Sequence, residues 1–210
     1  MSKKKKIIIF FIGLMILVLG VIICNRSGIG MDPFNAMCIG LADLLHVSSG
    51  TVMLVGNVSL LAIVWFTFRE LIGFATIFMA FGFGVIFDIY QQVIPASWFI
   101  SDSFWGSLLI FFLGVVVLTN GIALYMESQL GLAVYDCIAY IGEKYFKKPP
   151  FMIRMIADFT FAIIGYLVGG PIMIGTVILA TSVGPFIEFF RKMYERLLEK
   201  EKPVVNEIEL

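Results

Sequence analysis

The chain has 210 residues, of which 60% are hydrophobic and only 14% are charged. Soluble domains are usually about 45–50% apolar and about 25% charged, so these proportions exclude a soluble globular protein and predict an integral membrane protein. Fifteen basic and fifteen acidic residues cancel. The basic residues form no stripe interleaved with aromatic residues, so nucleic acid is not an expected partner.

The first predicted element follows four lysines at the N-terminus. Residues 7–24 form an apolar run, close to the roughly 20 residues that cross a bilayer. Lysines followed by an apolar run are also typical of a signal peptide. However, this run is as long as a span and a copy of it recurs at 106–125, so we interpret it as a retained first helix.

Further along the chain, long apolar stretches alternate with two short ones. The predicted spans are 7–24, 50–68, 72–93, 104–125, 152–168 and 172–190. Segments 34–46 and 134–146 have helical apolar spacing, but at about 1.5 Å per residue they are too short to cross. The expected fold is therefore an all-α polytopic membrane protein with about six transmembrane helices and two short re-entrant or interfacial helices.

The two halves of the chain are copies of each other. I-F-F-I-G at 9–13 recurs as I-F-F-L-G at 110–114, and later positions match at nearly constant spacing. We expect a first repeat over 1–101, a second repeat over 102–190 and a cytoplasmic tail over 191–210. Because three spans per repeat is an odd number, the second copy would be inverted in the membrane, as in many transporters.

The basic residues predict the orientation. With the N-terminus inside, Lys3–Lys6, Arg69, Lys144–Lys148 and the residues from Arg191 onward all fall on the cytoplasmic side, whereas Arg26 falls outside. An eight-span alternative would place Arg69 outside and would need two very short helices. Both termini are therefore expected in the cytoplasm.

Polar residues near the middle of the second and fifth spans are candidates for a functional site. A carboxylate at the bilayer centre costs about 2.5–3.5 kcal/mol, so Asp158 should face the protein interior or water. Arg154 lies one turn earlier and could pair with it. The predicted substrate or proton site comprises Asn57, Ser59, Arg154, Asp158 and Thr160. The alternative is a structural Arg154–Asp158 ion pair.

The third and sixth spans carry small residues at four-residue spacing, followed by an acid. We interpret the small residues as a helix-packing face, made of Thr76, Ala80, Gly84, Thr176, Ala180 and Gly184. The acids Asp88 and Glu188 are predicted at opposite membrane faces, where they would serve as gates. The alternative is two interfacial carboxylates that simply contact water.

The starts of the two short segments complete the candidate gates. Asp32, Pro33, Phe34 and Asn35 precede or begin the first segment, and Asp136 lies in the first turn of the second. Asp32 and Asn35 could cap a helix, and free N–H groups at such an end could also hold an anion. If the segments are not re-entrant, they would be amphipathic helices lying flat at the interfaces.

Two sequence motifs resemble those of a known family. G-M-D-P-F-N-A-M-C-I-G-L at 30–41 resembles a stretch of the YczE/YitT-type family of bacterial integral membrane proteins, in which Pro-Trp-Asp follows a Gly. Here Phe34 stands at the Trp position and Asn35 at the Asp position. G-F-A-T at 73–76, with G-V-I-F-D ending at residue 88, is similar to that family's G-x-G-T … G-x-x-x-D segment. The resemblance implies a polytopic protein of the bacterial plasma membrane.

The functional expectation is a small secondary transporter or permease whose small-molecule substrate is unknown. The alternative is a non-transporting scaffold or accessory subunit of another membrane protein, which would pack its polar midplane residues without a water-accessible cavity. No HExxH, GxSxG or P-loop motif occurs, so we expect no enzyme activity, metal or cofactor. The lipid bilayer is the expected environment, and a homodimer is compatible with so small a chain.

Overall fold

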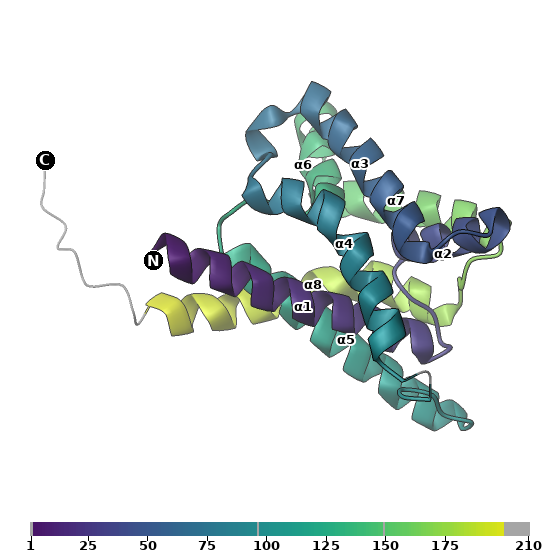
Figure 1. The fold of residues 1–210 in the computed structure, drawn as a ribbon. Helices are drawn as coiled ribbons and strands as arrows, with labels where there is room; N and C mark the ends of the chain where they lie inside the picture. Colours follow the sequence, from purple (N-terminus) through teal and green to yellow (C-terminus); the bar gives the residue numbers. More distant parts are fainter. Residues whose placement is uncertain (1, 96, 149, 200–210) are drawn as a thin grey trace, which may run out of the picture.

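The computed structural model describes residues 2–95, 97–148 and 150–199 and is helical throughout this part of the chain (Figure 1). In chain order, the helices are α1 (Lys3–Arg26), α2 (Pro33–Leu45), α3 (Ser49–Thr67), the 3₁₀ helix η1 (Arg69–Leu71), α4 (Phe74–Val93), α5 (Phe104–Glu127), α6 (Val134–Phe146), α7 (Pro150–Leu167) and α8 (Ile174–Glu199). The prediction of an all-α fold with two short helices is confirmed, and α2 and α6 begin within one residue of the expected positions.

Within the described ranges, five helices are long and apolar enough to cross a membrane, namely α1, α3, α4, α5 and α8. The fifth predicted span, 152–168, corresponds to α7, which is not among these five. The predicted boundary of the tail falls inside α8, which continues to Glu199. The rest of the predicted tail, residues 200–210, lies outside the described residues. The chain is therefore a multi-pass membrane protein.

Helices α1 and α5 form the centre of the molecule and approach each other through glycines. A Cβ atom added to Gly13 would lie 2.5 Å from the Tyr125 nitrogen, and one added to Gly20 would lie 2.3 Å from the Leu118 nitrogen. Later residues of α1 therefore contact earlier residues of α5, so the two helices are antiparallel. Only residues without a side chain allow backbones to approach this closely.

The contacts between the halves are reciprocal. Helix α2 of the first half packs on α7 of the second, and α6 of the second half packs on α3 of the first. The Gly175 nitrogen donates a hydrogen bond to the Ile29 carbonyl, and the equivalent Ala75 nitrogen donates to the Leu130 carbonyl, both at 2.9 Å. Positions that the duplication makes equivalent thus make equivalent contacts across the molecule. The inverted placement of the halves in a membrane stays a prediction.

The breaks before α2 and α6 depend on glycines in the left-handed region. Gly30 has a φ of 133° and Gly131 a φ of 122°, which L-residues with a side chain rarely adopt. Each glycine also packs against a threonine of the other half: a Cβ on Gly30 would lie 2.8 Å from the Thr176 nitrogen, and one on Gly131 would lie 2.7 Å from Thr76 Oγ1. These turns direct α2 and α6 back into the helix bundle.

The small-residue face is present on α4 but only partly on α8. Ala80 and Gly84 are buried, and a Cβ on Gly84 would lie 2.1 Å from the Gly50 carbonyl oxygen. Gly184 is exposed, and among the described residues no atom outside its own helix backbone lies within 4 Å of the position that a Cβ would take there. The expectation that Gly184 packs against another helix is therefore corrected.

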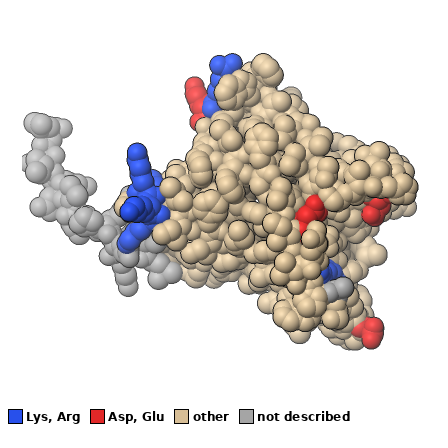
Figure 2. All heavy atoms as spheres, viewed as in Figure 1, with Lys and Arg blue, Asp and Glu red and all other residues tan. Residues whose placement is uncertain are grey.

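The outer surface matches a protein whose middle is surrounded by lipid. Large apolar side chains are exposed on several helices, including Phe66 at 83% and Trp105 at 75%. Figure 2 shows Lys and Arg gathered near the start of α1 and at the top of the molecule, a few separate charged groups toward the right and lower edges, and a broad uncharged surface in the middle of this face. The start of α1 and the end of α8 lie on the same side (Figure 1).

Candidate functional site

A cavity of about 100 Å³ lies between the two halves, and all eight α-helices or the turns before them contribute to its wall. Most lining residues fall into pairs that the duplication makes equivalent. These pairs are Leu17 with Leu118, Val21 with Ile122, Asp32 with Ala133, Pro33 with Val134, Phe34 with Tyr135, Asn35 with Asp136, Asn57 with Asp158, Met79 with Leu179, and Phe83 with Val183. Equivalent positions of the two halves therefore form much of the cavity wall.

Both short helices begin at this cavity. The residues from Asp32 to Asn35 and from Ala133 to Asp136 line it, so the N-terminal ends of α2 and α6 lie within the helix bundle. Asp32 is the N-cap of α2, as predicted, and its Oδ1 accepts a hydrogen bond of 3.0 Å from the Asn35 nitrogen. Helices lying flat on the surface would not place both ends in the interior.

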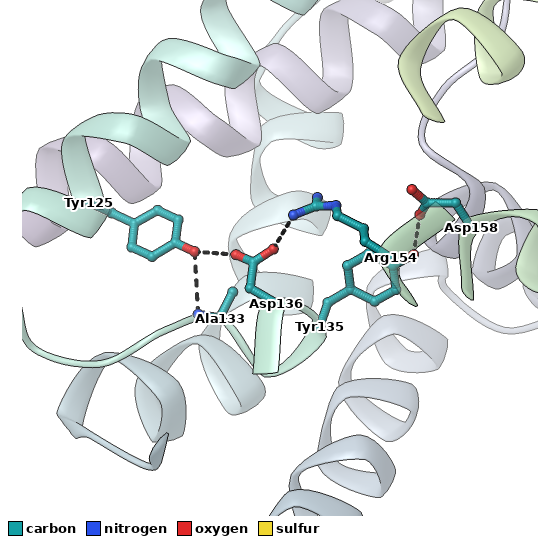
Figure 3. A network of polar contacts seen from close by, with 6 residues as sticks. All are labelled: Tyr125, Ala133, Tyr135, Asp136, Arg154 and Asp158. Atoms are coloured by element: carbon teal, nitrogen blue, oxygen red, sulfur yellow. Dashed lines mark hydrogen bonds and ion pairs between the residues drawn. The ribbon is translucent and has the colours of Figure 1, made fainter. Parts of the chain in front are cut away.

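Asp136 is held by two side chains from other helices (Figure 3). Arg154 Nη1 on α7 donates to Asp136 Oδ1 at 2.5 Å, and the Tyr125 hydroxyl on α5 donates to Asp136 Oδ2 at 2.5 Å. The Tyr125 oxygen in turn accepts a bond from the Ala133 nitrogen at 3.3 Å. Both oxygens of this buried carboxylate are therefore paired, as a buried charge requires.

Asp158 lies in the cavity wall, but its partner differs from the expected one. The carboxylate is 5% exposed and accepts a hydrogen bond from the Tyr135 hydroxyl on α6. Arg154 instead reaches across to Asp136, and its guanidinium lies 5.5 Å from the centre of the Tyr135 ring. The Arg154–Asp158 ion pair, which was the structural alternative for these residues, does not form, because α6 packs on α7 and brings a second carboxylate within reach of the long arginine side chain.

Asn35 and Asp32 form the equivalent corner of the first half. Asn35 Nδ2 donates to Asp32 Oδ2 at 2.8 Å. Asn35 is 7% exposed, and no described group donates a hydrogen bond to its buried Oδ1. The adjacent Phe34 ring packs on the rings of Tyr135 and Phe161, with centroid distances of 5.4 and 5.3 Å. The wall around Asn35 is thus aromatic, with one unpaired acceptor.

The remaining midplane candidates lie on different sides of their helices. Asn57 lines the cavity, and its Nδ2 donates to the Met53 carbonyl at 2.9 Å. Ser59 and Thr160 are exposed on the outside of their helices, where each hydroxyl donates to the carbonyl four residues earlier. Residues two apart do not face each other on a helix, so Ser59 and Thr160 cannot share the face of Asn57 and Asp158. Their expected place in the site is corrected.

The predicted gate acids have other contacts. Asp88 Oδ1 accepts a bond of 2.8 Å from the Gly50 nitrogen, so it caps the start of α3. Glu188 is exposed and forms an ion pair of 2.7 Å with Lys192. Neither lines the cavity. Thr76 and Thr176 accept bonds from the Gly73 and Met173 nitrogens, which stabilises the turns before α4 and α8.

Sequence reasoning did not identify Tyr125 and Tyr135 as site residues. Tyr125 is fully buried although it lies near the end of a predicted span, and a buried tyrosine hydroxyl usually has a hydrogen-bond partner. Tyr135 is the equivalent of Phe34 in the duplicated motif. A comparison of the two halves shows that the second half gains hydroxyl groups beside its carboxylates. This difference is the sequence feature that could have identified the two tyrosines as site residues.

Comparison with known proteins supports the resemblance of the two motifs. The chain is 26% identical to the uncharacterized protein YyaS of Bacillus subtilis (strain 168) over 194 residues, which cover 91% of this chain and 94% of that protein. It is 25% identical to the uncharacterized membrane protein YczE of the same organism over 187 residues, which cover 86% and 82% of the two chains.

A third relative comes from another bacterium. An uncharacterized protein of Haemophilus influenzae is 23% identical over 196 residues, which cover 93% of this chain and 88% of that protein. Comparison with solved structures gave no match. The family of unknown function DUF6198 matches residues 4–192, nearly the whole length, and the chain therefore belongs to this family.

Proposed function

We propose that the protein is a small secondary transporter of the bacterial plasma membrane, in which the central cavity holds the transported solute. The observation that carries this proposal is a cavity lined by ionisable residues at the contact between two duplicated halves. Charged residues deep in a membrane protein are costly and usually mark a substrate or ion pathway. A non-transporting scaffold gives no reason for a polar cavity at this position.

The two short helices support the same function. Transporters built from inverted repeats commonly place their substrate where discontinuous helices end near the membrane midplane. Here α2 and α6 both begin at the cavity, and α1 and α5 pack antiparallel around it. Movement of one half against the other would then expose the cavity alternately to the two sides of the membrane.

Asp158 is the residue that we propose to take up a coupling proton. Its partner in the structure is the neutral Tyr135 hydroxyl. Asp136, by contrast, is paired with the guanidinium of Arg154. Gaining a proton therefore breaks no ion pair at Asp158, whereas at Asp136 it would leave a buried arginine without its counter-charge.

Transport is tested with purified protein in two steps. A thermal-shift screen across amines, amino acids, peptides, lipids and drugs first identifies a stabilising ligand, and its uptake into proteoliposomes is then measured with and without a proton gradient. We expect wild-type uptake to depend on the gradient, and the Asp158→Asn and Asp158→Ala variants to lose that dependence.

Thr160→Ala is the matched control, because Thr160 lies on the same helix but faces away from the cavity. Its uptake should equal that of the wild type. A ligand that binds tightly but never crosses the liposome membrane would contradict transport and favour the alternative of an accessory subunit. Full gradient-dependent uptake by both Asp158 variants would remove Asp158 from the coupling step.

A further inference from the structure

Asn35 leaves one hydrogen-bond requirement of the cavity unmet. Its amide nitrogen donates to Asp32 Oδ2, and an ionised carboxylate can only accept, so the amide is oriented with Oδ1 away from Asp32. This oxygen is buried, and no described residue donates to it. A buried acceptor without a partner is destabilising, because it loses its hydrogen bonds to water without gaining another. Asn35 lines the cavity, so a cavity ligand with a hydrogen-bond donor close to this side chain would meet the requirement.

The charges around the cavity favour a cation. Three carboxylates, Asp32, Asp136 and Asp158, line it together with the single guanidinium of Arg154. With all four groups ionised the wall has a formal charge of −2, and protonation of one carboxylate would leave −1. The hydroxyls of Tyr125 and Tyr135 already donate to carboxylates. A ligand that matches this cavity would therefore supply positive charge and hydrogen-bond donors.

The short helices do not offset this preference. A helix N-terminus attracts anions through its free N–H groups and dipole. However, Asp32 already caps α2, and Asp136 occupies the first turn of α6. The chain's own carboxylates therefore stand where an anionic ligand would bind, and an anion would also meet their repulsion.

Size and wall chemistry restrict the cation further. A dry cavity of about 150 Å³ accommodates benzene, which has six heavy atoms, so a cavity of about 100 Å³ admits roughly four. The rings of Phe34 and Tyr135 also line the cavity, and aromatic faces attract cations. The volume and the aromatic wall together favour a small cation.

We infer that the central cavity selects a small organic cation with N–H donors, a protonated amine or a guanidinium group, which donates to Asn35 Oδ1 between the carboxylates of the two halves. This inference rests on the proposed function for its statement that the bound cation is the transported solute. The binding preference itself depends only on the cavity.

Guanidinium, urea and nitrate provide a test of charge at constant shape, because all three are planar and have four heavy atoms. Binding of radiolabelled guanidinium to the purified full-length protein is measured by equilibrium dialysis, with urea and nitrate as competitors at constant ionic strength. For four heavy atoms the dissociation constant should be no tighter than roughly tens of micromolar, so the titration extends into the millimolar range.

We expect saturable guanidinium binding that methylammonium displaces and that urea and nitrate at equal concentration do not. Tetramethylammonium, which lacks N–H donors, should compete poorly. Displacement by nitrate or urea as effective as by unlabelled guanidinium would overturn the inference. So would the absence of saturable binding of guanidinium, methylammonium and ammonium.

Variants at Asn35 test the proposed acceptor. Asn35→Leu removes Oδ1 and should weaken guanidinium binding about tenfold or more, the contribution of one hydrogen bond to a charged group. Asp158→Asn removes one carboxylate of the cavity wall and should also weaken guanidinium binding. Ser59→Ala, on the outer face of α3, is the control and should bind as the wild type does.

If Asn35→Leu does not fold, as its melting curve will show, Asp158→Asn still decides the question. Unchanged cation binding by Asp158→Asn would overturn the inference. Transport is tested separately: guanidinium binding without uptake into proteoliposomes removes transport but keeps the cation site. Uptake of an anion or a neutral solute through the cavity removes the cation site but keeps transport.

Discussion

At the scale of single residues, three positions carry charge in the second half of the chain but not in the first, whereas Asp32 is charged and its equivalent Ala133 is not. Asn35, Met53 and Asn57 of the first half correspond to Asp136, Arg154 and Asp158 of the second. The duplication thus supplied a symmetric cavity, and substitution of its polar positions gave the two walls different chemistry. Arg154 and Tyr125, which hold Asp136, have no polar counterparts at Met53 and Cys24.

The Arg154–Asp136 ion pair should be a stability determinant. Arg154→Met leaves a buried carboxylate without its counter-charge, and we expect a loss of about 3 kcal/mol, seen as a lower melting temperature in detergent. Asp136→Asn in the same background should recover much of the loss, because no charge then remains unpaired. If Arg154→Met destabilises the Asp136→Asn protein as much as the wild type, the two side chains are not coupled.

Accessibility to water should differ between two neighbouring positions of α3. In a background with Cys24, Cys38 and Cys137 replaced by alanine, Asn57→Cys points into the cavity and Ser59→Cys points outward. We expect a water-soluble thiol reagent to label residue 57 during the transport cycle, whereas residue 59 should be protected by lipid. Labelling of residue 59 alone would contradict a wet cavity between the halves.

At the scale of helices, close packing through small residues decides which elements touch. Gly84 of α4 lies against the Gly50 backbone of α3, whereas the equivalent Gly184 of α8 has open space beside it within the described structure. Helices α4 and α8 therefore have the same sequence pattern but different neighbours. A pattern of small residues permits close packing without determining where it occurs.

Alanine at these two equivalent glycines should have opposite effects. Gly84→Ala places a methyl group 2.1 Å from the Gly50 carbonyl oxygen, so α3 and α4 must separate, at a cost of about 1–3 kcal/mol. Gly184→Ala meets no atom and improves helix propensity by about 1 kcal/mol. Melting temperatures of the two variants measure the difference, and equal destabilisation by both would contradict the packing described for α4.

At the scale of the whole molecule, the two halves contact each other as equivalents related by an internal axis. The antiparallel α1–α5 contact and the paired backbone bonds before α4 and α8 both show this relation. If the halves are inverted in the membrane, the C-terminal ends of α2 and α6 must face opposite sides. Those ends carry the exposed, equivalent residues Leu45 and Phe146.

Membrane sidedness is tested at these two positions in the cysteine-free background. We expect Leu45→Cys to react with a membrane-impermeant thiol reagent in intact cells, and Phe146→Cys to react only after permeabilisation, because the basic residues near α6 favour the cytoplasm. Labelling of both residues from the same side would exclude inverted repeats. The alternating-access proposal would then lose its structural basis.

The membrane class, the helices, the two short segments and the duplication could all be predicted from the amino-acid sequence. These properties follow from local composition, from the period of apolar residues and from internal similarity, so they do not depend on which helices meet. The capping role of Asp32 and the interior position of Asp158 were predictable for the same reason. The outward orientation of Ser59 and Thr160 also follows from helical period, although the prediction placed both in the site.

Only the tertiary structure decided which partners the buried charges have. Arg154 could reach Asp158 along its own helix, but the packing of α6 against α7 offered it Asp136, and Tyr135 then became the partner of Asp158. Similarly, Asp88 became a cap because α3 begins beside the end of α4. Long polar side chains pair with whatever the folded chain brings within about 3 Å, and that distance is set by helix packing between segments far apart in sequence.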